Sequence, residues 1–144
     1  MKYRHISDCH VHSNHSPDGA DTVTMMCERA ASLGLHAITI TDHCECNEYV
    51  KSGYQDSIRA SYLESKRASA LFHPRIQVYS GIELGQATQD LFAAENILDA
   101  CDFDFVLASL HNIKGLPDFW ELEYKAGETE VLLEQYFDQM QQLV

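Results

Sequence analysis

Apolar and polar positions along this chain alternate between two periods, one typical of amphipathic helices and one typical of buried strands. The stretch 23–31 repeats apolar residues every three to four positions, whereas the apolar run of 36–43 is largely β-branched. Asp21 or Thr22 can cap the first helix and Gly34 can end it. The pattern predicts strands over 3–12, 36–43, 75–85 and 104–111, and helices over 21–34, 56–72, 90–103 and 128–144.

The order of these elements, a strand followed by a helix four times over, is typical of parallel βα units. The run 36–43 also has the composition of a strand that is buried on both faces of a sheet. The chain of 144 residues has the length of one domain and contains no linker, repeat or low-complexity tract. We therefore expect an α/β fold with a single domain over 1–144.

Side chains of the types that bind metals stand at the carboxyl ends of all four predicted strands. Because the carboxyl ends of parallel strands meet on one face of the fold, we expect these side chains to converge there. They are His10 and His12 after the first strand, Asp42 and His43 after the second, Glu83 in the third and His111 after the fourth.

Each of these residues has an ordinary structural explanation when it is taken alone. A His-x-His pair is often incidental, and Asp42 and His43 could simply form a turn after their strand. Glu83 could form a plain salt bridge, and His111 could be a satisfied core histidine. Coincidence at all four strand ends is a poor explanation, so the sequence favours a shared site.

Imidazole and carboxylate ligands in one cluster suit zinc, iron or manganese. Glu83 is the only glutamate among the strand-end residues. The two oxygens of a carboxylate can bridge ions about 3.5–4 Å apart, as two-metal hydrolases require. This set of residues indicates phosphoester hydrolysis by metal-activated water. The sequence has no glycine-rich phosphate loop and no serine nucleophile elbow, so we expect neither a kinase nor a serine hydrolase.

The composition argues against several other classes of protein. Asp and Glu total 22 against 10 Lys and Arg, a net charge of −12 that disfavours nucleic-acid binding. No apolar run reaches about 18 residues, so we expect no membrane span. The first residues lack the apolar core of a secretory signal, and the five cysteines lack disulfide-like spacing. We therefore expect a cytoplasmic protein that acts on a small phosphorylated substrate.

Four segments together resemble the successive motifs of the PHP (polymerase and histidinol phosphatase) metallohydrolases. They are DCHVHSNHSPDG (8–19), ITITDH (38–43), VYSGIELG (78–85) and VLASLHNIKG (106–115). Within that family, SLHNIKGLPDFW (109–120) and LLEQYFDQM (132–140) are most similar to the histidinol-phosphatase branch. The resemblance implies the N-terminal part of a distorted (β/α)7 barrel with up to three divalent ions at its carboxyl-end face.

Carried over residue by residue, the resemblance gives each candidate a role. His10 and His12 look like ligands of a first metal, Glu83 like the bridge to a second, and His111 like a ligand of the second. Asp18 and His43 look like ligands of a third, with His15 as the competing candidate for the place of Asp18. Asp8 and Asp42 look like partners that orient histidines. The residues expected to take part in catalysis are Glu83, His111 and Asp42.

The chain also departs from the family pattern. Ala108 stands where relatives usually have Gly, and the relatives continue for a further stretch that supplies one more His to the second metal and an Asp and a His to the first and third. We expect the missing half to come from a longer product or from homo-oligomerisation, because a half barrel leaves an unpaired strand edge.

Two hypotheses for function follow. The first is a metal-dependent phosphomonoesterase similar to histidinol-phosphate phosphatases, and the second is a non-catalytic or partial module that binds metal and acts by association. Two smaller alternatives stay open as well. Cys44 and Cys46 beside His43 could bind zinc or be ordinary loop cysteines, and the segment 118–124 could line a substrate pocket or cover a core edge.

Overall fold

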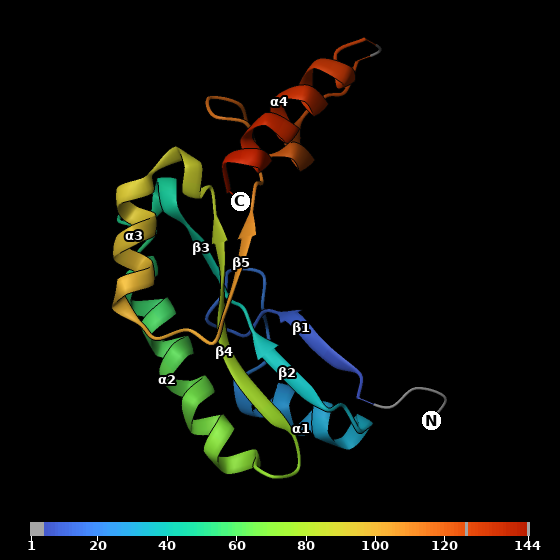
Figure 1. The fold of residues 1–144 in the computed structure, drawn as a ribbon, viewed down its shortest axis with the longest axis vertical. Coiled ribbons are helices and arrows are strands. Elements are labelled where there is room, and N and C mark those ends of the chain that lie inside the picture. Colours follow the sequence, from blue (N-terminus) through green and yellow to red (C-terminus); the bar gives the residue numbers. More distant parts are fainter. Residues whose placement is uncertain (1–4, 126, 144) are drawn as a thin grey trace.

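The computed structural model of this chain describes residues 5–125 and 127–143, which form an open, curled sheet with helices packed along it (Figure 1). The strands are β1 (Ser7–Val11), β2 (Ala37–Ile40), β3 (His43–Glu45), β4 (Gln77–Gly85) and β5 (Phe105–Ser109). The helices are α1 (Val23–Leu33), α2 (Tyr54–Phe72), α3 (Leu91–Ala100) and α4 (Thr129–Leu143), with short 3-10 turns η1 (Cys46–Glu48), η2 (Ala87–Gln89) and η3 (Phe119–Glu121). The expected α/β class and the N-terminal part of a curled barrel are confirmed.

All paired strands run parallel, and β4 is the centre of the sheet. β1 pairs with β2, and β2 pairs with the first half of β4. β3 and β5 both pair with the second half of β4. Parallel pairing directs every carboxyl strand end to one rim, which is where the sequence places the histidines and carboxylates.

The single strand predicted over 36–43 is wrong in one respect, because it divides into β2 and β3. Ile40 lies opposite Ser80 and His43 lies opposite Glu83, so both pieces keep the same register along β4. The break comes at Thr41, whose N–H donates to the carbonyl of Val11 on β1. The second piece then continues beyond the predicted end to Glu45.

The start and end of α1 are as the sequence predicts. The side chain of Thr22 accepts a hydrogen bond from the N–H of Met25, which satisfies one of the free donors of the first turn. Gly34 ends the helix with φ 75°, a left-handed conformation in which a residue with a side chain would be strained. Its N–H donates to carbonyls of the last turn.

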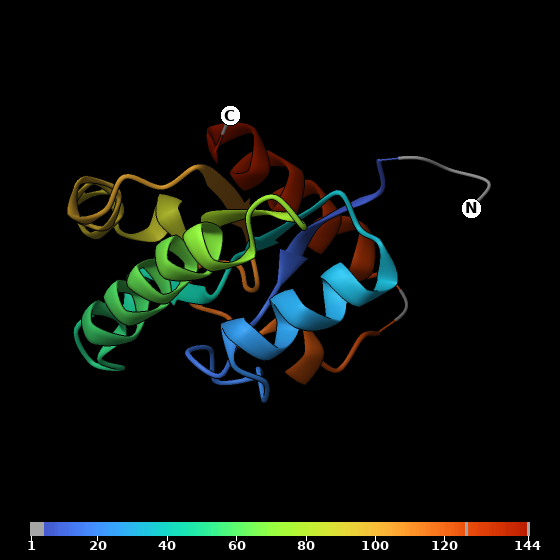
Figure 2. The same cartoon turned by 90° about the horizontal axis from the view of Figure 1, so that it is seen from below.

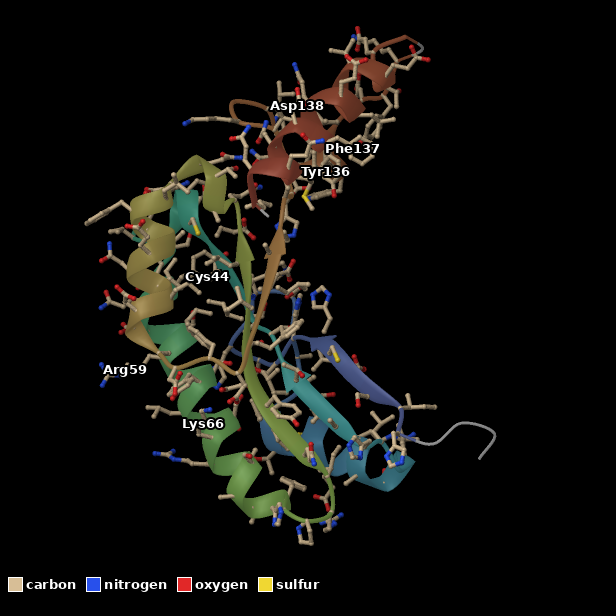
Figure 3. The ribbon with its side chains drawn as sticks, viewed as in Figure 1. Cys44, Arg59, Lys66, Tyr136, Phe137 and Asp138 are labelled. Carbon is tan, nitrogen blue, oxygen red and sulfur yellow. The ribbon has the colours of Figure 1, made fainter. Side chains whose placement is uncertain are left out.

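Two apolar clusters join the helices to the sheet. The first lies between α1, α2 and the β2–β4 region, where Cys27, Ile40 and Phe72 are buried together; Figure 2 shows α1 and α2 beside the sheet. The second joins α3 and the start of α2 to β3 and β4. Ile97 and Ile82 are its most buried aliphatic residues, and Cys44 lies among them (Figure 3). The first half of β4 packs in the first cluster and its second half packs in the second, so the position of Glu83 is fixed by packing.

Most of the C-terminal helix projects from this body, although its last described residue, Leu143, packs against the second cluster. Figure 1 shows α4 projecting from the end of the sheet, and none of its described residues is buried. Tyr136 stacks edge-on against Phe119, but Phe137 beside it is 58% exposed (Figure 3). Strand β5 is also largely exposed. Among the residues described, no helix is long and apolar enough to cross a membrane.

Candidate metal centre

Glu83 occupies the centre of the carboxyl-end rim, and its carboxylate is the point on which the histidines converge. It is 3% exposed, in the middle of the buried part of β4. The parallel register places it opposite His43 on β3 and Leu107 on β5. A buried carboxylate is costly unless cations or hydrogen-bond donors compensate it, so its surroundings are decisive.

His10 near the end of β1 and His12 just after it lie against one side of this carboxylate. Residues two apart in a strand share a face, which directs His10 and His12 the same way. Their Nε2 atoms lie 3.1 and 2.9 Å from Oε2 of Glu83 and 3.0 Å from each other. Two nitrogen atoms from the end of β1 and one carboxylate oxygen from β4 are therefore within reach of one ion.

Asp18 extends the cluster from the loop after β1. Its Oδ2 lies 3.0 Å from Nδ1 of His12 and 3.4 Å from Nε2 of His43. Ser16 donates a hydrogen bond of 2.7 Å to Oδ1 of the same carboxylate and steadies it. His15, the competing candidate, instead places its Nε2 2.8 Å from the carboxylate of Glu64 on α2, away from this group. The structure thus brings Asp18, rather than His15, to His12 and His43.

A third group forms on the β3–β5 side. Oε1 of Glu45 lies 2.8 Å from Nδ1 of His111 and 3.4 Å from Nδ1 of His43. The other ring nitrogen of His111, Nε2, lies 3.0 Å from Oε1 of Glu83. The rings of His12, His43 and His111 follow one another along the rim with centroids 4.4 and 5.1 Å apart.

The charges of the cluster shift the pKa values of its members. Burial acts to raise the pKa of Glu83, but the hydrogen bond with His111 and the charge of His43 outweigh it and lower the pKa to about 2. The carboxylates of Glu45 and Glu83 raise the pKa of His111 to about 10. Without ions, His111 is therefore held as an imidazolium between the carboxylates of Glu45 and Glu83.

The donor set fits divalent metal ions. Two ligand atoms at about 2.1 Å from a tetrahedral ion lie about 3.4 Å apart, and the contacts around Glu83 run from 2.9 to 3.3 Å. Nδ1 of His43 is buried and forms no hydrogen bond with any part of the described chain, an arrangement that a cation would relieve. Nitrogen and carboxylate oxygen ligands together suit zinc, iron or manganese.

Asp42 makes its hydrogen bonds with serines of the loop after β1 and of α2. It is fully buried, and its Oδ2 accepts a 2.7 Å hydrogen bond from the hydroxyl of Ser13. It also accepts hydrogen bonds from the backbone N–H of Ser13 and from the hydroxyl of Ser61 on α2. Asp42 therefore ties the loop after β1 to α2, and among the described residues it makes no hydrogen bond to a histidine ring.

An open cavity of about 730 Å³ lies beside the cluster. His43, Glu45 and His111 form its floor, and Tyr54, Trp120 and Glu121 belong to its lining. Trp120 and Glu121 come from the 118–124 segment, so part of this segment lines the cavity, and its contact with a substrate stays a prediction. The lining within the described chain contains five carboxylates and neither Lys nor Arg.

Comparison with known proteins agrees with this geometry. The model of the PHP domain family matches residues 8–144, nearly the whole chain. The chain belongs to the PHP family. A protein described as "Probable histidinol-phosphatase" from Clostridium acetobutylicum is 26% identical over 135 residues, covering 94% of this PHP chain and 51% of the relative. The histidinol-phosphatase of Lactococcus lactis subsp. lactis is 29% identical over 108 residues, covering 74% and 39% respectively.

A solved structure extends the comparison to the fold. The crystal structure of histidinol phosphate phosphatase from Lactococcus lactis, complexed with zinc, L-histidinol and phosphate, matches with a TM-score of 0.56 and 26% identity. The match covers 77% of this PHP chain and 42% of that structure. The chain thus spans about half the length of the curated relative it matches most fully, and its open sheet corresponds to part of the PHP barrel.

The structure brings together all six residues that the sequence proposed as ligands, namely His10, His12, Asp18, His43, Glu83 and His111. Their individual roles stay predictions. Glu45 was missed, because the strand was expected to end at His43. Its spacing was the available signal, since residues 43 and 45 share a face of a continuing strand. Cys44, between them, points into the core, and burial raises the pKa of nearby Cys46 to about 12, which argues against a zinc site on this pair.

Proposed function

We propose that this PHP chain forms the metal-binding half of a phosphomonoesterase that acts on a small phosphorylated substrate. The observation that carries the proposal is the convergence of four histidines on the buried carboxylate of Glu83, at the carboxyl ends of parallel strands. A buried carboxylate with this many imidazoles in contact exceeds what a single structural ion pair requires.

Each residue has a proposed place in the site. His10 and His12 would hold one ion and His111 a second, with the two oxygens of Glu83 shared between them. Asp18 and His43 would hold a third position. Bound divalent ions would supply Lewis acidity toward a phosphate oxygen and lower the pKa of water near them. The chain itself contributes the rigid spacing, because the ligands stand on strands whose register fixes them.

The role proposed for Asp42 is positioning. Its bonds to Ser13 and Ser61 fix the loop that carries Asp18, so it would act through the ligands and not on the substrate. The direct catalytic role that its place at the strand end suggests stays a prediction. Glu83 and His111 keep their proposed roles because both lie in the convergent cluster.

The cavity supports the choice of substrate class. The phosphate would lie against the ions on the His43–His111 side, because the described lining offers no Lys or Arg to neutralise it. The carboxylates beyond suit a leaving alcohol that carries positive charge. The related lactococcal structure holds L-histidinol and phosphate, so L-histidinol phosphate is the substrate to test first.

A second function is favoured by the exposed end of the sheet. β5 is largely exposed, and α4, with no buried residue described, leaves Val131 and Phe137 more than half exposed. An amphipathic helix of 15 residues is marginal without a surface to pack on. We propose that further βα units, from a second copy or a longer product, cover this end, and that the chain can act as a metal-binding module through that association.

Phosphate release from L-histidinol phosphate and from p-nitrophenyl phosphate, with and without added Zn²⁺ or Mn²⁺, tests the enzymatic proposal. We expect metal-dependent release that is lost in Glu83→Gln and kept in Glu95→Gln, an exposed carboxylate on α3. Tight metal binding without release from either ester would contradict the enzyme and leave the module. Light scattering during size-exclusion chromatography then measures whether two chains associate.

A further inference from the structure

His111 is held from both sides by carboxylates, and only one of them belongs to the shared metal position. Nε2 faces Oε1 of Glu83 at 3.0 Å, and Nδ1 faces Oε1 of Glu45 at 2.8 Å. An imidazole binds a metal in its ring plane through one nitrogen, so an ion at Nε2 lies on the side of the ring away from Glu45. Glu45 is therefore badly placed to bind the same ion directly.

Glu45 is well placed to act through the ring. An ionised carboxylate can only accept hydrogen bonds, so the 2.8 Å contact requires the proton of His111 to be on Nδ1. An ion that binds at Nε2 takes the place of the proton that faces Glu83 there, and Glu45 keeps the remaining ring proton on Nδ1. Carboxylates that fix a metal-binding histidine in this way typically change metal affinity 10- to 100-fold when they are removed.

The backbone makes a specific place for this carboxylate. Glu45 lies directly opposite Gly85 in the parallel β3–β4 register. A Cβ added to Gly85 would lie about 2.5 Å from the carboxylate carbon of Glu45, so the carboxylate packs on the bare Cα. The side chain of Glu45 is only 18% exposed as a result. Gly85 is therefore part of the arrangement that directs Glu45 onto His111.

We propose that Glu45 is a positioning residue of the metal centre, which fixes the tautomer and orientation of His111 from a space that Gly85 leaves open. This inference rests on the proposed metal function of the cluster. It adds to that function a pair of residues on adjacent strands, Glu45 and Gly85, which sets the metal affinity of the position that His111 would hold.

Titration of the metal-free chain with Zn²⁺ by calorimetry tests this pair, with Co²⁺ absorption spectra as a second readout of the ligand set. We expect Glu45→Ala to weaken one binding step between about 10- and 100-fold without changing the number of ions bound. Glu45→Gln keeps a carbonyl oxygen that can accept from Nδ1–H, so it should recover part of the lost affinity. Glu95→Gln, an exposed carboxylate on α3, is the matched control and should match the unmodified chain.

Gly85→Ala gives an independent route to the same result. The added methyl group meets the flexible end of Glu45 and not backbone, so the fold should persist while the carboxylate is displaced. We expect a loss of affinity similar to that of Glu45→Ala, and no further loss when both substitutions are combined. Circular dichroism of each metal-free variant checks that the fold is retained.

The possible outcomes distinguish the role of Glu45 from the proposed metal binding by the cluster. An unmodified chain that binds no Zn²⁺ would overturn the metal centre itself. Normal binding by the chain with unchanged affinity in Glu45→Ala would overturn only the role of Glu45. Loss of one whole ion in both Glu45 variants, with an altered Co²⁺ spectrum, would make Glu45 a direct ligand and also overturn the positioning role. Additive losses in the double variant would show that Gly85 does not act through Glu45.

Discussion

Glu83 and His43 stand directly opposite each other in the β3–β4 ladder, with Oε2 of Glu83 3.3 Å from Nδ1 of His43. The contact crosses the part of the sheet where β2 has ended and β3 has begun. Because β3 keeps the register of β2, the break brings a second ligand-bearing strand end to Glu83 without moving β4. The central position of Glu83 is thus a consequence of strand pairing, and substitutions there should affect both of the ions that it is proposed to share.

Glu83→Gln should remove most of the stabilisation of the chain by metal. A ligand at one hundred times its dissociation constant stabilises a protein by about 2.7 kcal/mol, which is the shift we expect for the unmodified chain in Zn²⁺. The neutral amide cannot replace a shared carboxylate, so the rise in melting temperature that Zn²⁺ causes should be much smaller in the variant. Thermal unfolding followed by circular dichroism measures both. A full metal-induced shift in the variant would show that ions bind elsewhere, and Glu95→Gln should behave as the unmodified chain.

The metal-free chain should lose stability in acid as Glu83 is protonated. Its pKa is lowered from 4.5 to about 2 by His111 and His43, so its favourable contribution is fully present above about pH 4.5 and is lost as the pH falls through 2. Urea unfolding at a series of pH values in a chelator measures this. In Glu83→Gln, the free energy of unfolding should depend less on pH in this acid range. An unchanged pH dependence in that variant would show that Glu83 is not the group responsible.

At alkaline pH, the metal-free chain should lose the stabilisation that the charged ring of His111 provides. Its pKa is raised from 6.5 to about 10, so its contribution is fully present below about pH 6.5 and is lost as the pH rises through 10. In His111→Gln, the metal-free free energy of unfolding should depend less on pH over that window. Metal binding requires the neutral ring, so Zn²⁺ affinity should rise with pH over the same range. Affinity that is constant with pH would argue against His111 as a ligand.

Much of this site could be predicted because parallel topology places strand ends together whatever the details of packing. His10, Glu83 and His111 were found in this way, from strand patterns alone. Asp18 needed the family resemblance, since a loop residue has no periodicity. Glu45 was missed because the apolar pattern stops at His43, and only the pairing of His43 with Glu83 shows that the strand continues. The exposure of α4 could not be predicted either, because its amphipathic sequence is equally suited to packing on a neighbour.

Asp42→Ala should destabilise the fold more than any exposed carboxylate substitution. The buried carboxylate accepts hydrogen bonds from Ser13 and Ser61, and removing it leaves those donors without partners. Loss of charge-assisted hydrogen bonds of this kind costs about 3 kcal/mol. Chemical unfolding should show this loss, whereas Asp99→Ala on the exposed face of α3 should stay within about 0.5 kcal/mol. A small effect at Asp42 would mean that the loop is held by other contacts.

Trp120 should report directly on occupancy of the cavity. It is the only tryptophan of the chain, it is 80% exposed, and it belongs to the cavity lining opposite the histidines. A bound ligand would remove water from the indole, so L-histidinol with phosphate in the presence of Zn²⁺ should shift the emission to shorter wavelength. Trp120→Phe removes the signal and serves as the blank, while calorimetry with the same ligands reports binding independently. Binding by calorimetry with an unchanged emission spectrum would place the ligand away from η3, and the substrate would then have to approach the ions from the His10 side.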